Sequence, residues 1–323
     1  MKNTKISWCD NTFNPWIGCT KVSSACANCY AAAMDHRWGH DSFGAGKPRR
    51  RTSEEYWGQP LGWNAEVEQA MDRRERAMLV APSGSILPNH PATPRVFCAS
   101  LADWLDGEVP IEWLADLLAL IHATPYLDWL LLTKRPENWA RRVEAASLCE
   151  HNDRNEYYGR NVGCWMANWL RGDAPENVWV GTTVEYQDMA DERIPALLKI
   201  PARIRFLSCE PLLGPVQFGH IPPEGDTDEG ERIHWVICGG ESGPNARPMH
   251  PDWARSLRDQ CKAAGVPFFF KQWGAWAPRE TRPDDARFMG DEGEFKSCGG
   301  MVRNTKRPAG CLLDGNGHKE FPQ

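Results

Sequence analysis

Short apolar runs, each followed by a polar or glycine-rich turn, recur along the chain from residue 95 onward. Continuous apolar runs of this kind are typical of strands buried on both faces, as in parallel sheets. Together with KISWCD at 5–10 they predict about seven strands. The runs are RVFCASLADWLD (95–106), DWLLLTKRPENW (128–139), NVWVGTTVEY (177–186), RIRFLSCEPLLGP (203–215), IHWVICGGESGP (233–244) and VPFFFKQWG (266–274).

Helix-like segments separate several of these runs, at residues 111–124, 189–200 and 250–265. The last of them ends at Gly265, with Pro267 close behind, which is a strong helix stop. Strand and helix in alternation predict an α/β fold with a parallel sheet. Seven strands are too few for a complete eight-stranded barrel, and a doubly wound sheet fits the same order of elements.

Polar residues at the carboxyl ends of the predicted strands favour the barrel. A ring of loaded loops at that end is how barrel enzymes build their active sites. We therefore predict a partial TIM barrel of about six or seven parallel strands. The strand-end residues are Asp10, Ser100, Asp103, Thr133, Lys134, Arg135, Thr182, Glu185, Glu210, Glu241, Lys271 and Gln272.

Two stretches depart from the alternation. Residues 140–176 predict a polar helical insertion within a barrel that spans residues 1–275. Residues 276–323 are rich in Gly, Pro and charge without clear periodicity, and predict a loop-rich extension. Cys298 and Cys311 lie in this extension, where nothing nearby supports either a disulfide or a metal site.

Cysteine usage depends on the compartment. No apolar run approaches the roughly 18 residues that span a bilayer, and the first ten residues lack the apolar core of a signal peptide. A cytoplasmic location is therefore expected. In a reducing compartment, clustered cysteines among the twelve of this chain indicate metal binding or catalysis rather than disulfides.

One cluster stands out, in NPWIGCTKVSSACANCYAAAMDHRWG at residues 14–39, where the spacing is C-x6-C-x2-C. A structural zinc site would need a fourth ligand, for which Cys9 or His36 is available. The thiols could instead be unrelated residues of a loop. The third alternative is an iron–sulfur cluster held by three thiolates, with one iron open to another ligand. The loop follows the first predicted strand, which places it at the carboxyl face of a barrel.

Four stretches resemble a known family: residues 4–31 around the cysteines, FLSCEPLLGP (206–215), WVICGGESGPNARPM (235–249) and FFFKQWG (268–274). They resemble the phage-associated three-cysteine-motif family of radical-SAM-like proteins, which is found in phages and prophages. The resemblance implies a partial TIM barrel and a [4Fe–4S] cluster on Cys19, Cys26 and Cys29. It also implies S-adenosylmethionine as cofactor and the three-Cys-motif partner protein as companion. The usual radical-SAM signature is C-x3-C-x2-C, so the first gap here is longer.

The same resemblance implies cofactor contacts at the strand ends. Ser100 and Asp103 are placed, by their order in the chain, to meet the methionine amine, with Asp103 as acceptor. Glu241 lies in a Gly-Gly-Glu segment similar to one that contacts this amine in radical-SAM proteins. Glu185 or Glu210 is suited to the ribose hydroxyls, because a carboxylate accepts two hydroxyl hydrogens well.

Lys134 and Arg135 are suited to the methionine carboxylate or to a substrate phosphate, and Thr182 completes the predicted cofactor-binding set. For each of these residues, a structural salt bridge or cap at a strand end is the competing explanation. The tryptophans beside the motifs, Trp16, Trp104 and Trp273, could stack on a base, although packing in the core is the commoner role.

The sequence thus predicts a radical-SAM-like enzyme that acts on an unknown substrate, which could be a nucleotide or nucleobase. The alternative is a non-catalytic binding or assembly protein with a structural zinc or iron–sulfur site. A radical enzyme would need an electron donor such as flavodoxin or ferredoxin. The net charge of −6 and the few clustered basic residues predict weak or no nucleic-acid binding by the chain alone.

Overall fold

A seven-stranded parallel sheet, curled into a half-barrel, forms the centre of the computed structural model. The structure describes residues 1–81, 89–149, 161–219, 232–278, 301–303 and 310–322. The strand order β1-β4-β5-β6-β7-β8-β9 confirms the predicted partial TIM barrel. The strands are β1 (Asn11–Phe13), β4 (Arg95–Cys98), β5 (Asp128–Thr133), β6 (Val178–Thr183), β7 (Ile204–Cys209), β8 (Trp235–Gly239) and β9 (Phe268–Gln272).

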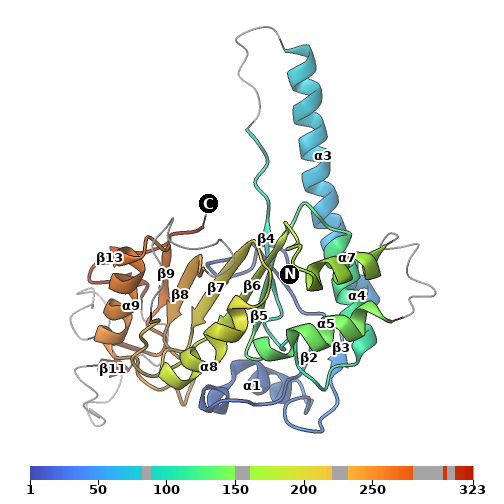
Figure 1. The fold of residues 1–323 in the computed structure, drawn as a ribbon. Helices are drawn as coiled ribbons and strands as arrows, with labels where there is room; N and C mark the ends of the chain where they lie inside the picture. The colour runs from blue at the N-terminus through green and yellow to red at the C-terminus, as the bar shows by residue number, and fades with distance from the viewer. Residues whose placement is uncertain (82–88, 150–160, 220–231, 279–300, 304–309, 323) are drawn as a thin grey trace.

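Helices connect the strands and cover the outer face of the sheet (Figure 1). The three predicted helices are present as α4 (Ile111–His122), α8 (Gln187–Leu198) and α9 (Pro251–Ala263). Between β1 and β4 the chain forms η1 (Ser24–Asn28), α1 (Tyr30–Arg37), α2 (Glu54–Trp57) and α3 (Gln59–Val80), with β2 (Trp16–Ile17) paired to β3 (Arg50–Arg51).

The two faces of the sheet bury separate apolar cores. Successive side chains of a strand point to opposite faces, so alternate residues of one strand enter different cores. Phe206 of β7 faces the inside of the half-barrel, whereas Leu207 faces the helices. The inner core is largely aromatic and includes Trp8, Phe97, Trp179, Trp235 and Phe269. Each such side chain contributes about 1.5–3 kcal/mol on burial.

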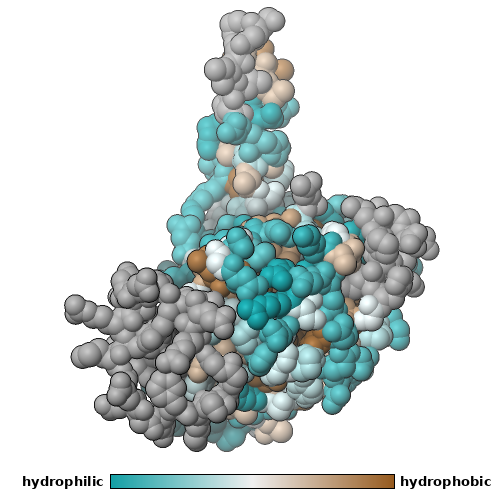
Figure 2. Space-filling model, turned by 90° about the vertical axis from the view of Figure 1, so that its left-hand side faces the viewer, coloured by the Kyte–Doolittle hydropathy of each residue, from teal (hydrophilic) through white to brown (hydrophobic). Residues whose placement is uncertain are grey.

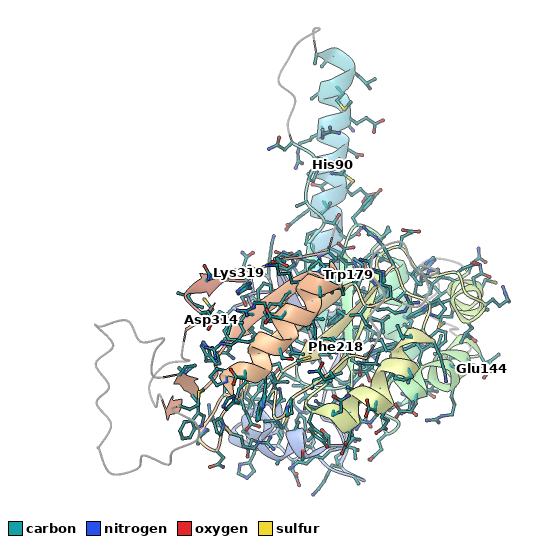
Figure 3. All side chains as sticks on the ribbon, turned by 60° about the vertical axis from the view of Figure 1, so that its left-hand side comes forward. His90, Glu144, Trp179, Phe218, Asp314 and Lys319 are labelled. Carbon is teal, nitrogen blue, oxygen red and sulfur yellow. The ribbon has the colours of Figure 1, made fainter. Side chains whose placement is uncertain are left out.

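The C-terminal segment completes the open end of the half-barrel. Lys319 forms an antiparallel bridge with Phe269, and the Phe270 backbone N–H donates to the His318 carbonyl at 2.9 Å. The Phe321 ring lies 5.2 Å from Trp235. Figure 3 shows Lys319 and Asp314 of this segment on the side of α9. The predicted extension therefore belongs, in its last residues, to the inner core.

The rest of the extension contains β10 (Trp276–Pro278) paired with β11 (Met301–Arg303), and β12 (Leu312–Leu313) paired with β13 (Asn316–Gly317). Cys298 lies outside the described residues, and Cys311 is a free thiol. Asp314 accepts hydrogen bonds from two arginines of α9, Arg255 and Arg258, at 2.8 and 2.7 Å. These contacts attach the segment to the barrel.

The first strand differs from the prediction. It is Asn11–Phe13 rather than residues 5–10. Trp8 packs into the inner core, with its ring 4.5 Å from Phe97, and Ile6 packs beside it. The alternation of apolar Ile6 and Trp8 within residues 5–10 therefore reflects burial of these side chains and not pairing of a strand. Asp10 consequently lies at the amino end of the sheet, where its carboxylate binds the Arg95 guanidinium at 3.1 Å.

The predicted insertion at 140–176 forms the connection between β5 and β6. It contains α5 (Trp139–Ser147, after the short η2, Pro136–Asn138) and α7 (Val162–Leu170); residues 150–160 lie outside the described part. Its inner side is not polar, because Met166 and Trp169 are buried, and the Trp104 and Trp169 rings stack 6.4 Å apart. Helical structure was predicted correctly, but the segment is also part of the outer core.

Helix α3 projects away from the barrel (Figures 1 and 2). Its first turns are anchored by Trp63 and Val67, whereas Leu79 and Val80 near its end are exposed. Figure 2 shows that the barrel face on the α9 side is mostly hydrophilic. Within the described residues, no helix combines the length and apolar character needed to cross a membrane.

Candidate functional site

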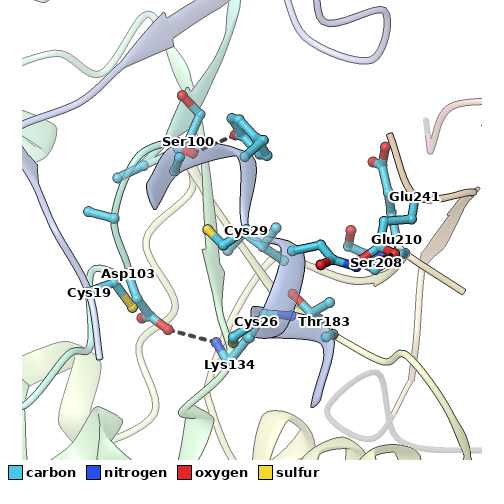
Figure 4. A pocket seen from close by; sticks show the side chains of 18 of the residues that line it. Cys19, Cys26, Cys29, Ser100, Asp103, Lys134, Thr183, Ser208, Glu210 and Glu241 are labelled. Atoms are coloured by element: carbon cyan, nitrogen blue, oxygen red, sulfur yellow. Dashed lines mark hydrogen bonds between the residues drawn. The ribbon is translucent and has the colours of Figure 1, made fainter. Parts of the chain in front are cut away.

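A cavity of about 440 Å³ opens at the carboxyl end of the sheet. All three cysteines of the motif line it, together with residues from β4 to β9 and the loops that follow them. Figure 4 shows Cys19 and Asp103 on one side of this cavity and Ser208, Glu210 and Glu241 on the other. The predicted convergence of the cysteine loop with the strand ends is therefore present.

The cysteine loop, residues 18–29, begins at a glycine that the fold requires. Gly18 has φ of +114°, and a Cβ there would lie 2.4 Å from the Ser42 carbonyl oxygen. Its N–H donates to the Leu101 carbonyl at 3.1 Å, which fixes the start of the loop over the end of β4. Cys26 lies within η1, and Cys29 directly precedes α1. The chain thus presents its thiols from a short, turn-rich path.

The thiols differ in their electrostatic surroundings. Burial, followed by the Asp103 carboxylate, raises the pKa of Cys19 to about 12. Burial also acts to raise the pKa of Cys26, but backbone groups of Val22 and Ser23 and the Lys134 ammonium outweigh it, so the pKa lies below its usual value. Among the residues described, no three His, Cys, Asp or Glu side chains are gathered closely enough to hold one metal ion.

Asp103 is a fully engaged acceptor at the end of β4. One carboxylate oxygen accepts from the Thr133 hydroxyl at 2.7 Å and the Leu105 N–H at 3.0 Å. The other accepts from the Lys134 N–H at 2.9 Å and the Arg135 guanidinium at 2.7 Å. A carboxylate offers about four acceptor positions. The geometry therefore favours a structural role for Asp103 over the predicted contact with an amine.

Arg135 does not line the cavity. Its guanidinium also donates to the Thr20 carbonyl and lies 3.5 Å from the Cys19 sulfur. It thereby connects Asp103 to the cysteine loop. With its donors directed to these groups, Arg135 is placed to position Cys19 rather than to bind a phosphate.

Glu185 is fully buried behind the cavity. Its carboxylate accepts from Arg193 at 2.8 Å, from the Ser23 hydroxyl at 3.0 Å and from the Lys134 ammonium. Glu185 does not line the cavity, whereas Lys134 does. The geometry therefore favours a structural role for Glu185, in which its carboxylate holds the cysteine loop, over the predicted contact with ribose hydroxyls.

Glu241, which follows β8 at the same carboxyl end of the sheet, also holds the cysteine loop. Its carboxylate accepts from the Arg247 N–H, Nε and Nη2 at 2.8, 2.9 and 2.6 Å, and from the Asn28 amide at 3.1 Å. Arg247 Nη1 donates to the Ser24 carbonyl at 3.1 Å. Glu241 lines the cavity, and its carboxylate already accepts these four hydrogen bonds, three of them on Oε2. Asn28 and Arg247 were not identified from the sequence.

Strand alternation decides which strand-end residues face the cavity. Thr182 is buried on the outer face, where its hydroxyl donates to the Thr133 carbonyl at 2.9 Å, and it does not line the cavity. Thr183, the next residue, does. The structure thus places Thr183, rather than the predicted Thr182, at the cavity wall. Ser100 lines the cavity as predicted, and its hydroxyl bonds to the Asn14 amide.

The wall opposite the cysteine loop carries a separate ion pair. Lys271 of β9 donates to the two carboxylate oxygens of Glu210 at 2.7 and 2.9 Å. Both line the cavity, beside Ser208 and Gln272. The three tryptophans considered for base stacking, by contrast, are buried: Trp16 and Trp104 completely and Trp273 to 2% exposure. Their role is core packing, and Trp8 is the tryptophan that lines the cavity.

The fold and the site thus define an α/β half-barrel protein with a three-cysteine loop at its carboxyl-end cavity. By sequence, the chain belongs to the family described as "Protein of unknown function (DUF5131)", which it matches over residues 3–322. No curated protein and no solved structure matches it.

Proposed function

We propose that this protein is a radical-SAM-like enzyme that carries a [4Fe–4S] cluster in the carboxyl-end cavity. The observation that carries the proposal is that Cys19, Cys26 and Cys29, on one short loop, all line one cavity of a parallel half-barrel. Three thiolates leave one iron of such a cluster open to another ligand. The cavity volume, about 440 Å³, lies in the range of small-molecule sites.

The residues present fit such a cluster. The donor set is three thiols, and soft thiolates are the ligands that iron–sulfur clusters require. When bound, the cluster and S-adenosylmethionine would supply one-electron chemistry, which the protein alone cannot perform.

The chain's own contribution is to hold the loop and to line the cofactor space. Asp103 with Arg135, Glu185 with Lys134, and Glu241 position the loop through the contacts described above. Of the predicted cofactor-binding residues, Ser100, Lys134 and Glu210 line the cavity. Each still has a hydrogen-bonding position that no described residue fills. We assign contacts with S-adenosylmethionine to the first two.

The wider setting is proposed on the same basis. A cytoplasmic enzyme of this kind would receive electrons from a donor such as flavodoxin or ferredoxin, and a three-Cys-motif partner protein would assist it. An acidic chain with few clustered basic residues would bind nucleic acid weakly on its own. A nucleotide-sized substrate therefore suits it better than a duplex.

Metal content tests the proposal. Protein purified without oxygen should be brown, contain iron and labile sulfide in near-equal amounts, and bleach with dithionite. Changing Cys19, Cys26 or Cys29 to Ala should remove most of the iron, because two thiolates rarely retain a cluster. Cys164→Ala, at an exposed thiol away from the cavity, is the matched control.

Stoichiometric zinc without iron would instead support the alternative of a structural site in a binding or assembly protein. In iron-loaded protein, S-adenosylmethionine should change the EPR spectrum of the reduced cluster. An unchanged spectrum would separate a cluster protein from a radical-SAM enzyme.

A further inference from the structure

The Glu210–Lys271 pair lies across the cavity from the cysteine loop. It makes fewer hydrogen bonds than the charged groups that hold that loop. Each side chain retains exposure, 18% for Glu210 and 22% for Lys271. Among the described residues, neither has a hydrogen-bond partner other than the other. Two of the three Lys271 donors are used, and the carboxylate has further acceptor positions. The pair therefore offers one donor and at least one acceptor, side by side, to the cavity.

A glycine on the intervening strand makes this arrangement possible. Glu210 follows β7 and Lys271 belongs to β9, so β8 runs between them. At Gly239 of β8 a Cβ would lie 3.2 Å from the Glu210 carboxyl carbon and from one of its oxygens. The Glu210 side chain thus leans over Gly239 toward Lys271. A larger residue there would push the carboxylate away from its partner.

An apolar surface lies in the same cavity as the pair. Ile6, Trp8, Phe97 and Leu132 line this cavity together with Glu210 and Lys271, and Trp8 and Phe97 belong to the inner core. A planar apolar ring fits against these side chains, with its polar edge toward Glu210 and Lys271. A purely charged ligand would gain little from such a surface.

We infer that Glu210 and Lys271 recognise the substrate of this enzyme, and that it is a planar heterocycle with adjacent N–H and C=O groups. Such a lactam edge occurs in guanine, uracil and thymine. The Glu210 carboxylate accepts from the N–H, and the Lys271 ammonium donates to the carbonyl. This inference deepens the proposed function, because it places a substrate beside the cofactor space, but the recognition itself needs no cluster.

Binding of free nucleosides to the whole chain tests the inference. Guanosine or uridine should bind, measured by calorimetry, at least about tenfold more tightly than adenosine, which has no carbonyl. Glu210→Gln and Lys271→Met should each weaken that binding about tenfold or more, since each removes a charged hydrogen bond. Glu192→Gln, at an exposed carboxylate of α8, should leave it unchanged.

A swapped pair guards against loss of folding. In the double variant Glu210→Lys with Lys271→Glu, the ion pair is kept and its polarity reversed, so thermal unfolding should be little changed while lactam binding falls. Equal binding by the wild type and these variants would overturn the inference. So would the absence of binding to guanosine and uridine, or binding of adenosine and S-adenosylhomocysteine alone, which would assign the pair to the cofactor.

The outcome is separable from that of the proposed function. A variant with Cys19, Cys26 and Cys29 changed to Ser should lose iron yet still bind the lactam nucleoside. Protein that contains zinc and binds uridine through Glu210 would refute the cluster and keep this inference. Protein that contains the cluster and binds no lactam would do the reverse.

Discussion

The carboxylates at the carboxyl end of the sheet differ in how many hydrogen bonds they accept. Of the three that hold the cysteine loop, Asp103 and Glu241 each accept four, and Glu185 accepts three in full burial. Glu210, which does not contact the loop, accepts two, both from Lys271. All four follow a strand of one sheet, so position in the fold does not separate them. They are separated by how many hydrogen-bond acceptor positions remain unused. The unused positions of Glu210 mark the wall of the cavity on which a ligand can still be bound.

The largest expected effect is at Glu185. Glu185→Ala leaves the Arg193 guanidinium, whose side chain is 2% exposed, without its carboxylate. Breaking a buried pair in this way costs about 3–5 kcal/mol. Urea denaturation should show a loss of this size, against almost none for Glu192→Ala on the surface of α8. A loss below about 1 kcal/mol would mean that Glu185, like Glu210, does not hold the cysteine loop in the way that Asp103 and Glu241 do.

Gly18 offers a sharper test of the cysteine side. Gly18→Ala meets both positive φ, which costs about 1–3 kcal/mol, and the Ser42 carbonyl at 2.4 Å. Gly39→Ala is the control, since Gly39 has φ of +79° but nothing within 4 Å of the added Cβ. We expect Gly18→Ala to be the less stable of the two and to lose iron on anaerobic purification. Equal stability would mean that the loop tolerates displacement.

The sequence predicted the sheet well because burial on both faces leaves continuous apolar runs. It also contained the signal that separates Thr182 from Thr183: the two-residue period that places Trp179 and Phe206 on the inner face extends to Thr183, Ser208 and Glu210. Applied strictly, this alternation would have selected the cavity-facing residues.

The contacts of Glu241 and Arg247 that hold the cysteine loop had no such local signal in the sequence. Asn28 and Glu241 are 213 residues apart, and Arg247 reaches Ser24 across 223. Contacts between such distant positions depend on how the half-barrel closes, which no local pattern records. The misplaced first strand has a related cause, since Ile6 and Trp8 alternate because they fill the inner core, which only the closed fold creates.

The smallest effect expected is the pH dependence of the Glu241 clamp. Burial acts to raise the pKa of Glu241, but the hydrogen bonds from Arg247 and Asn28 outweigh it and hold the pKa below the usual 4.5. A folded-state pKa below the unfolded one stabilises the protein above the unfolded value, and this stabilisation is lost as the pH falls through the folded value. Arg247→Met should therefore lower the urea midpoint above about pH 4.5, and the difference from wild type should shrink at lower pH.

Because the Arg247 side chain is 34% exposed, solvent screening limits the difference to about 1 kcal/mol or less. Arg258→Met, which removes contacts to Asp259 and Asp314 but none to the loop, is the matched control for loss of a surface arginine. Only the Arg247 variant should also release the loop, seen as faster amide hydrogen exchange over residues 24–28 at neutral pH. Equal exchange in the two variants would show that Glu241 and Arg247 stabilise their own turn and leave the cysteine loop to Glu185 and Arg135.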